Sequence, residues 1–387
     1  MGINSEQIDS PISWQRMSNS GQKGVQTVQM RPSTSRASAL DQIGKLSQLG
    51  GITHFLHAEG KAKGISTLRV RTAHGLELWV VPDRGMDIYE ASFQGKSLCW
   101  HSPTGMVHPS FYTNHGTEWL KTFAGGLLTT CGLTTVGVPS NDNGESLGLH
   151  GSISNTPAEN VSWSENWEGD DCIFTVSGKV REVFVHGPNL LLERTISTSL
   201  NSASFVINDL VENQGFQDSP LMILYHFNFG FPLLTPKSQI YAPSKKAEPI
   251  DEISSHSLGE WNSFGAPHMG QGERVYFHEM EKDSAGRVSV VLVSDRDNPC
   301  FGICLSYDAT SLPQFIEWKM TGTNHFVLGL EPANCLILGR DKERQRGTLQ
   351  LLAPGERRES QLEFRVLDSA TQVADAIRTS NARHLVL

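Results

Sequence analysis

From Ile52 onward, apolar and polar residues alternate in short runs of about four to eight residues, separated by Gly, Asn, Asp and Pro. A period of two places every second side chain on the same face, as in a β-strand. The runs 68–71 and 76–81 flank Ala73-His74-Gly75 and predict a β-hairpin. The other runs that predict strands are 87–93, 97–100, 173–177, 179–185, 190–198, 205–212, 221–228, 288–293, 302–307, 314–319, 326–330, 348–352 and 361–366.

Helices are predicted in only two segments. Residues 38–49 begin with Ser38, a suitable N-cap, and place three apolar residues on one face. Residues 371–379 form the second segment. The polar interval 236–272 is predicted to be loop-like, and residues 1–37, rich in Ser, Gln, Asn and Thr, to be a flexible or loosely docked extension.

The order of these elements favours one all-β domain over residues 38–387. About fifteen strands follow one another without a Pro-, Gly- or Ser-rich linker, which is typical of a large antiparallel β-sandwich with few short helices. The chain has no alternating βαβ pattern and neither of the glycine-rich phosphate-binding motifs, which disfavours nucleotide-binding folds.

Composition narrows the class of partner. The 387 residues include 32 basic and 41 acidic side chains, a formal charge of -9, with no basic block. Nucleic acids and anionic membranes are therefore not expected as partners, because binding to them depends on neutralising phosphates. No apolar stretch approaches the roughly 20 residues of a membrane-spanning helix, and the N-terminus lacks a signal-peptide core, so we expect a cytoplasmic protein.

The six cysteines do not suggest a disulfide framework. Cys300 and Cys304 form a Cys-x3-Cys pair without a second ligand cluster nearby. If that segment is a strand, both side chains face the core.

Two histidines and a glutamate next to predicted strands are the candidate acid and base groups. His226 lies in the nearly continuous apolar run 221–228, so it is either a hydrogen-bonded core residue or a residue facing a cavity, and Asn228 shares its face. Glu331 follows an apolar strand and is either a rim charge or a general base with a raised pKa. His150, between Leu149 and Gly151, is either a turn residue or a site residue.

Four further residues are candidate substrate contacts. Arg84 and Asp87 occupy a predicted turn, where an arginine can form a structural ion pair or a substrate clamp, and we favour the clamp. Asn334 is suited to orient Glu331 or bind a hydroxyl. Glu317 precedes Trp318, and a carboxylate beside an aromatic ring suits a sugar, although tryptophans are more often core residues. Trp100 and Trp119 are weaker signals of the same kind.

Taken together, these residues resemble the galactose mutarotase (aldose 1-epimerase) superfamily, and most closely its DUF4432 branch. The resemblance rests on five segments that follow one another in the expected order: 82–88, 123–133, 149–159, 224–233 and 329–334. It implies a large antiparallel β-supersandwich that needs no cofactor. It also implies that Glu331 takes the proton of the anomeric hydroxyl, that His226 protonates the ring oxygen, and that His150 hydrogen-bonds one of these oxygens.

The sequence departs from the mutarotase pattern at one position, because the family's arginine ahead of His150 is absent. Our hypothesis is that Arg84 replaces it. Arg84→Ala is then expected to raise KM without unfolding the chain. Two alternatives stay open. One is an isomerase, epimerase or lyase for a keto-sugar or sugar derivative, with a divalent metal on His150, His226 and Glu331. The other is a non-catalytic carbohydrate-binding protein.

The expected partner is a small-molecule carbohydrate, and a homo-oligomer stays open. A phosphorylated sugar would find cations in the cluster Arg340, Lys342, Arg344 and Arg346, although a solvated charge run explains that cluster more simply.

Overall fold

The computed structural model describes residues 35–380. Residues Pro32–Leu387 belong to one compact unit. The predicted extension 1–37 lies almost entirely outside the described residues. Within the described part of the chain, no helix is long and apolar enough to cross a membrane.

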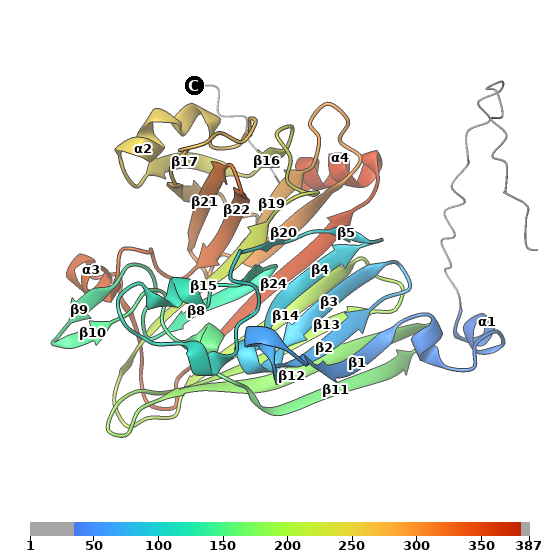
Figure 1. The fold of residues 1–387 in the computed structure, drawn as a ribbon, viewed down its shortest axis with the longest axis horizontal. Helices are drawn as coiled ribbons and strands as arrows, with labels where there is room; N and C mark the ends of the chain where they lie inside the picture. Colours follow the sequence, from blue (N-terminus) through green and yellow to red (C-terminus); the bar gives the residue numbers. More distant parts are fainter. Residues whose placement is uncertain (1–34, 381–387) are drawn as a thin grey trace, which may run out of the picture. The chain divides into compact units, whose positions relative to one another are not determined.

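The described chain is built around two large antiparallel sheets, which are drawn in Figure 1. The larger sheet has twelve strands. Its main path, in spatial order, is β1 (Gly51–Leu56), β2 (Ser66–Arg71), β3 (Leu76–Val81), β4 (Asp87–Phe93), β8 (Leu128–Leu133), β15 (Ser219–Phe229), β22 (His325–Ala333), β21 (Gln314–Gly322), β18 (Arg274–Met280) and β17 (Ser244–Pro249). The short strands β5 (Lys96–Ser97) and β23 (Gln350–Leu352) pair with β4 and β15.

The smaller sheet has eight strands. In spatial order they are β11 (Glu159–Glu168), β12 (Asp171–Val183), β13 (Asn189–Ser199), β14 (Ser204–Asn213), β24 (Arg357–Leu367), β20 (Gly302–Asp308), β19 (Arg287–Val293) and β16 (Gln239–Tyr241). Two small ribbons complete the strands: β6 (Trp100–His101) with β7 (Gly125–Gly126), and β9 (Ser140–Asp142) with β10 (Glu145–Leu147).

Helices are short in the described residues. The α-helices are α1 (Arg36–Leu40), α2 (Glu252–His256), α3 (Arg340–Arg346) and α4 (Ala370–Thr379). Single 3₁₀ turns are η1 (Leu46–Gln48), η2 (Gly60–Ala62), η3 (Pro82–Arg84), η4 (Pro109–Phe111), η5 (Glu118–Lys121), η6 (Ile153–Asn155) and η7 (Leu258–Glu260).

The main hydrophobic core lies between the two sheets, and β15 shows how the site is separated from it. Tyr225 and Phe227 belong to this core together with apolar residues of both sheets. Met222 and Leu224 point to the other face of β15 and join a second apolar cluster. Strand alternation places His226 on this second face, away from the intersheet core. The nearly continuous burial of β15 explains why its sequence is apolar on both faces.

The β-sandwich class, the hairpin β2–β3 and the helix α4 are confirmed. Three local predictions are wrong. The helix predicted for 38–49 ends at Leu40 and resumes only as the turn η1. The interval 236–272, predicted to be loop-like, contains two strands: β16 lies at one edge of the smaller sheet and β17 at one edge of the larger sheet. Cys304 is buried, but Cys300 lies before β20 and is exposed.

Candidate active site

His226 and Glu331 face each other across neighbouring antiparallel strands of the larger sheet. The register of β15 with β22 pairs Leu224 with Ala333 and Phe227 with Leu330, which sets His226 directly opposite Glu331. The Nε2 atom of His226 lies 3.1 Å from Oε1 of Glu331. Both side chains are buried, at 5% and 2% exposure. The two groups are therefore close enough to act as an acid and a base on the same ligand.

Gly329 makes room for this pair. It lies two residues before Glu331 on β22 and shares its face. A Cβ atom at position 329 would lie 2.5 Å from Oε1 of Glu331 and 3.1 Å from Cε1 of His226. The absence of a side chain at this position is thus a condition for the pair to form.

His150 reaches the pair from a loop that is docked onto β8. Its backbone N–H donates to the carbonyl of Gly137, and its own carbonyl accepts from the N–H of Gly132, both at 3.0 Å. Its φ of 58° is a conformation that non-glycine residues seldom adopt and that concentrates at functional sites. The following Gly151 has no space for a side chain, since a Cβ would lie 2.4 Å from the carbonyl oxygen of Gly132.

Aromatic rings surround the two histidines. The centroids of His150 and His226 are 6.2 Å apart. Phe123 lies 5.4 Å from His226 and Trp318 lies 5.3 Å from it, while Trp119 lies 4.8 Å from His150. We call Trp100, Trp119, Phe123 and Trp318 the aromatic wall, because neighbouring members contact one another. Such rings suit the apolar face of a pyranose and keep water away from the pair.

Burial keeps the three ionisable groups uncharged. It lowers the pKa of His150 to about 4. Burial, reinforced by repulsion from His150, lowers the pKa of His226 to about 3. Burial raises the pKa of Glu331 well above its ordinary value, and the nearby carboxylates of Glu273 and Glu317 add to the effect. These shifts favour a protonated Glu331 next to a neutral imidazole.

Unpartnered polar atoms gather at the same place. Within residues 35–380, Nδ1 of His150, Nδ1 of His226, Oδ1 of Asn228 and Oε1 of Glu331 are buried without a hydrogen-bond partner. The 3.1 Å approach of His226 to Glu331 is thus close but not aligned as a hydrogen bond. Asn228 is fixed by its own Nδ2, which donates to the carbonyl of His226 at 3.0 Å. Buried polar atoms are rarely left unpaired, and four of them belong to the neighbouring residues of this site.

The structure gives Arg84 a different role from the substrate clamp predicted for it. Its guanidinium donates to the carbonyls of Val107 and Thr122 at 2.9 and 2.8 Å. Burial lowers its pKa to about 10, against the opposing field of Asp87. Both contacts lie in the loop that carries Trp119, so Arg84 fastens the aromatic wall.

Asp87 is also engaged internally. Its carboxylate accepts from the N–H and hydroxyl of Thr130 and lies 3.1 Å from Nη1 of Arg194, a residue of the opposite sheet. Arg194 in turn pairs with Asp209 at 2.6 Å. Burial raises the pKa of Asp87 to about 6, although Arg194 opposes the shift. Asp87 is therefore a buried tie between the sheets, which corrects its interpretation as a substrate contact.

Glu317 and Asn334 are likewise structural. Glu317 is 0% exposed and lies 3.2 Å from Nε2 of His278. It precedes Trp318 on β21, so strand alternation turns it to the face opposite the aromatic wall. Asn334 accepts from the N–H of Ile223 at 2.7 Å and donates to a neighbouring backbone carbonyl, which fixes the end of β22 beside β15.

The cationic cluster of α3 is bound by acidic residues of this chain. Arg340 is 3% exposed, and its Nε lies 2.7 Å from Asp142. Arg344 binds the other oxygen of Asp142, also at 2.7 Å. The two arginines thus anchor the β9–β10 ribbon rather than a phosphate, and the solvated charge run is wrong for the buried Arg340, whereas Arg344 is exposed.

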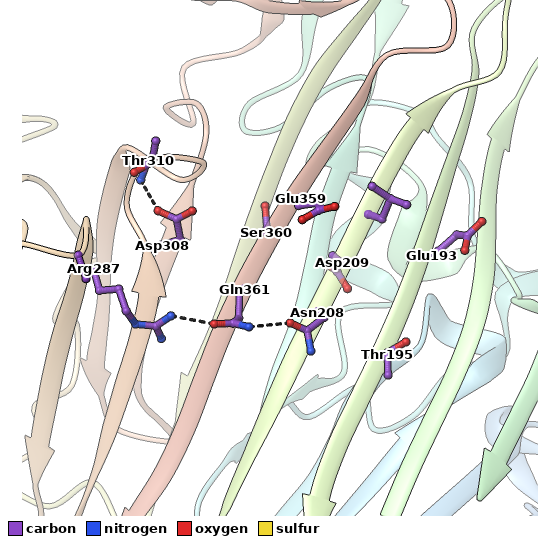
Figure 2. Close-up of a pocket in the computed structure, with 12 residues that line it drawn as sticks. Glu193, Thr195, Asn208, Asp209, Arg287, Asp308, Thr310, Glu359, Ser360 and Gln361 are labelled. Atoms are coloured by element: carbon purple, nitrogen blue, oxygen red, sulfur yellow. Dashed lines mark hydrogen bonds between the residues drawn. The ribbon is translucent and has the colours of Figure 1, made fainter.

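Pockets elsewhere in the molecule include a small one lined by Arg84 and Asp87. A pocket of about 680 Å³ lies over the outer face of the smaller sheet (Figure 2). In it Arg287 donates to Gln361, which donates to Asn208, both at 2.9 Å. This pocket contains none of the candidate site residues.

The site thus contains four of the predicted residues: His150, His226, Asn228 and Glu331. Phe123 and Gly329 were missed as members of the site. A glycine two positions before a glutamate on an apolar strand is a usable signal for space beside the carboxylate, whereas nothing in the sequence marks Phe123. Among the described residues, His150, His226 and Glu331 do not form a group whose ligand atoms all lie within 4.8 Å, so the geometry does not favour the three as metal ligands.

The sequence matches the model of a family described as "Domain of unknown function (DUF4432)" over residues 62–366. The chain belongs to the DUF4432 family. No curated protein is significantly similar to this DUF4432 member.

Solved structures share its fold. A candidate aldose 1-epimerase from Klebsiella pneumoniae subsp. pneumoniae MGH 78578 is 25% identical, with a TM-score of 0.81 over 85% of this chain and 86% of that chain. A galactose mutarotase-like protein from Clostridium acetobutylicum is 13% identical, with a TM-score of 0.58 over 83% and 99%. Galactose 1-epimerase from Lactobacillus acidophilus NCFM is 10% identical, with a TM-score of 0.53 over 83% and 99%. The DUF4432 chain therefore has the galactose mutarotase-like sandwich fold.

Proposed function

We propose that this chain is an aldose 1-epimerase-like isomerase that interconverts the anomers of a sugar by general acid/base catalysis. The observation that carries the proposal is the buried pair of His226 and Glu331, 3.1 Å apart, in a site where four buried polar atoms have no hydrogen-bond partner. The names of the structurally similar proteins support the same class of reaction.

The pair contains one acidic proton, on Glu331, and one free basic nitrogen, on His226. Transfer of this proton from Oε1 of Glu331 to Nε2 of His226 gives a carboxylate and an imidazolium without changing the total charge. The carboxylate then removes the proton of the anomeric hydroxyl while the imidazolium protonates the ring oxygen. The bond between C1 and the ring oxygen breaks, C1 becomes an aldehyde, and the new hydroxyl carries the donated proton.

Rotation about the C1–C2 bond exposes the other face of the aldehyde. The ring hydroxyl then attacks C1, His226 recovers a proton from that hydroxyl, and Glu331 returns one to the new anomeric oxygen. Each transfer is made by a positioned group, and such catalysis typically contributes about 10²–10⁴-fold. His150, neutral because its pKa is lowered to about 4, is suited to donate a hydrogen bond to an oxygen of the sugar.

The charges around the site support an uncharged sugar as the substrate. The arginines considered for an anion, Arg84, Arg340 and Arg344, are all bound by oxygens of this chain. The aromatic wall instead offers apolar faces. A phosphate placed there would lose hydration without gaining a cation in return.

Polarimetry of freshly dissolved α-aldoses tests the proposal. Wild-type protein is expected to accelerate the approach to the equilibrium rotation for at least one sugar, and Glu331→Gln and His226→Asn to lose the acceleration. Matched controls are Glu279→Gln and His325→Asn, which alter an exposed carboxylate on β18 and a half-buried histidine at the start of β22. Saturable sugar binding without acceleration would instead identify the chain as a carbohydrate-binding protein and not an enzyme.

A further inference from the structure

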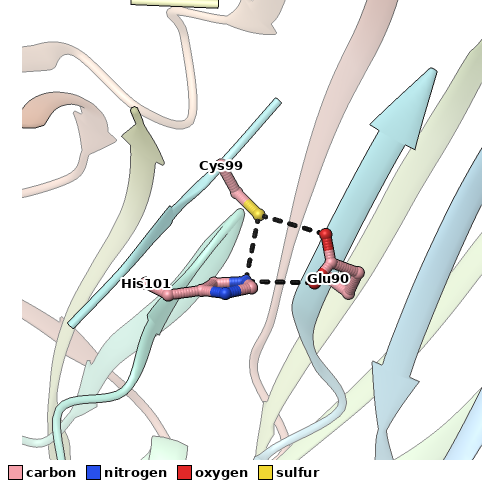
Figure 3. Close-up of side chains that lie close together, drawn as sticks. All are labelled: Glu90, Cys99 and His101. Carbon is pink, nitrogen blue, oxygen red and sulfur yellow. Dashed lines mark hydrogen bonds and ion pairs between the residues drawn. The ribbon is translucent and has the colours of Figure 1, made fainter. Parts of the chain in front are cut away.

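A second cluster of ionisable side chains lies behind the aromatic wall. Cys99 and His101 flank Trp100, and because side chains alternate along an extended chain, both point away from the side on which Trp100 contacts Phe123. Glu90, on β4, faces them from the neighbouring strand. Figure 3 shows the three side chains converging on one point.

The three distances come within a few tenths of an ångström of the edges of a metal-centred tetrahedron, with a different oxygen of Glu90 nearest to each of the other two ligands. Sγ of Cys99 lies 3.4 Å from Nε2 of His101 and 3.9 Å from Oε1 of Glu90. Nε2 of His101 lies 3.2 Å from the other oxygen of Glu90. Zinc bonds of about 2.3 Å to sulfur and about 2.0–2.2 Å to nitrogen and oxygen give tetrahedral edges of about 3.3–3.6 Å. Small side-chain movements would bring all three ligands to bonding distance.

The surroundings of Cys99 also favour a cation. Its sulfur lies 3.7 and 3.8 Å from the carbonyl oxygens of Tyr89 and Ala91. The thiol donates toward these oxygens, and a dication bound to the sulfur would take the place of the thiol proton beside them. The ring of His101 stacks on Tyr89 at 4.8 Å, which holds its orientation. The side chains of His101 and Glu90 are 38% and 22% exposed, so an ion can enter from solvent and keep a fourth, open position.

We propose that Glu90, Cys99 and His101 bind a divalent zinc-class ion, with three protein ligands and one exchangeable position. A thiolate, an imidazole and a carboxylate are the ligand types that zinc accepts. The ion would join β4 to the strand of His101 and thereby hold Trp100 against Trp318, whose ring centroid is 6.2 Å away. The site is separate from the His226–Glu331 pair, and the inference does not depend on the reaction catalysed there.

The alternative is a metal-free hydrogen-bonded group of thiol, imidazole and carboxylate. Cobalt substitution distinguishes the two, because a Co²⁺–thiolate bond gives a near-ultraviolet charge-transfer band and tetrahedral Co²⁺ gives intense visible bands. Full-length protein without a histidine tag is stripped with a chelator and titrated with Co²⁺ and then Zn²⁺. The expected result is one ion per chain, both cobalt signatures, displacement by Zn²⁺ and a higher melting temperature with Zn²⁺.

Variants identify the ligands. Cys99→Ala is expected to remove the charge-transfer band, and His101→Gln to abolish stoichiometric binding. Cys300→Ala removes an exposed thiol and is the control for adventitious binding; Glu331→Gln is the control for the catalytic pair. Both controls are expected to bind Co²⁺ as wild type does.

Substoichiometric binding, a charge-transfer band that survives Cys99→Ala, or loss of the band in Cys300→Ala would overturn the proposal. Should Cys99→Ala fail to fold, His101→Gln decides the question, because its side chain is partly exposed and its loss leaves the thiol in place. Unchanged binding by a folded His101→Gln variant would equally exclude the site.

Discussion

Replacing Glu331 by glutamine is expected to stabilise the protein while removing its activity. Glu331 is 2% exposed, and burial raises the pKa of its carboxyl group well above the ordinary 4.5. Glutamine has nearly the same shape but does not ionise. Ionisation of Glu331 in the unfolded state stabilises the unfolded wild-type chain, and the variant removes this effect. A gain in stability on replacing a site residue is expected where the site is built at the expense of stability.

The sign and size of the effect follow from proton linkage. Below pH 4.5 the carboxyl group is protonated in both the folded and the unfolded wild-type chain, and its ionisation makes no difference. As the pH rises above this value, the unfolded chain loses the proton that the folded chain retains. The wild-type protein then loses about 1.4 kcal/mol of stability per pH unit relative to Glu331→Gln, until Glu331 ionises in the folded state as well.

Urea unfolding at a series of pH values measures this difference directly, and both proteins are expected to have the same dependence on denaturant. Glu279→Gln, on an exposed carboxylate, is the matched control and should show no such divergence. A stability difference that does not change with pH, or a variant that is less stable throughout, would refute a protonated Glu331 in the resting site.

Three further substitutions test other parts of the site. Gly329→Ala would place a methyl group 2.5 Å from the catalytic carboxylate oxygen. We expect this variant to keep the fold and to lower kcat at least about tenfold. The control Gly272→Ala, where the nearest atom is 3.6 Å away, should leave kcat unchanged. Asp87→Asn removes one partner of the buried Arg194 and should lower the free energy of unfolding, measured with urea, by about 3 kcal/mol. An unchanged unfolding midpoint would contradict the role of Asp87 as a tie between the sheets. Arg84→Ala removes two charge-assisted hydrogen bonds to backbone carbonyls and should lower the free energy of unfolding by about 3 kcal/mol or more. A higher KM with unchanged stability would instead support the substrate clamp predicted from the sequence.

The fold could be predicted from the sequence where strands carry a clear pattern. The apolar run of β15 and the alternation of β2 and β3 identify strands directly. β11 was not predicted, because Glu165 interrupts the alternation of Val161, Trp163 and Trp167 and most of the strand is exposed. β17 was read as loop because it is short and polar and ends at Pro249. The sequence also does not show that β8, β15 and β22 are neighbours, since their pairing depends on contacts between distant segments.

Part of the site could be predicted because its residues stand next to strands with a clear pattern. His226, Glu331 and His150 stand next to strands and in motifs that resemble the mutarotase family, and the structure brings them together. Glu317 was misplaced because adjacent residues of a strand face opposite sides, and the register that decides which side is the site was not known. Arg84 was misread because its partners are backbone carbonyls, which leave no trace in the sequence.

The neutrality of the resting pair also explains how the site tolerates deep burial. An ionised carboxylate with 2% exposure and no cation beside it would be costly, whereas a protonated Glu331 next to a neutral His226 avoids that cost. Charge separation is then confined to the moment when sugar hydroxyls are present to stabilise it. The aromatic wall contributes by excluding water, which strengthens the interactions between the pair and those hydroxyls.

Exchange NMR between the anomeric protons of an aldose at equilibrium tests the central claim most directly, because it measures ring opening and closure without coupling enzymes. For at least one sugar, wild type is expected to raise the exchange rate in proportion to protein concentration. Glu331→Gln and His226→Asn should each reduce that rate by about 10²–10⁴-fold while keeping the wild-type fold. Undiminished exchange in either folded variant would contradict the assignment of the His226–Glu331 pair as the acid and base.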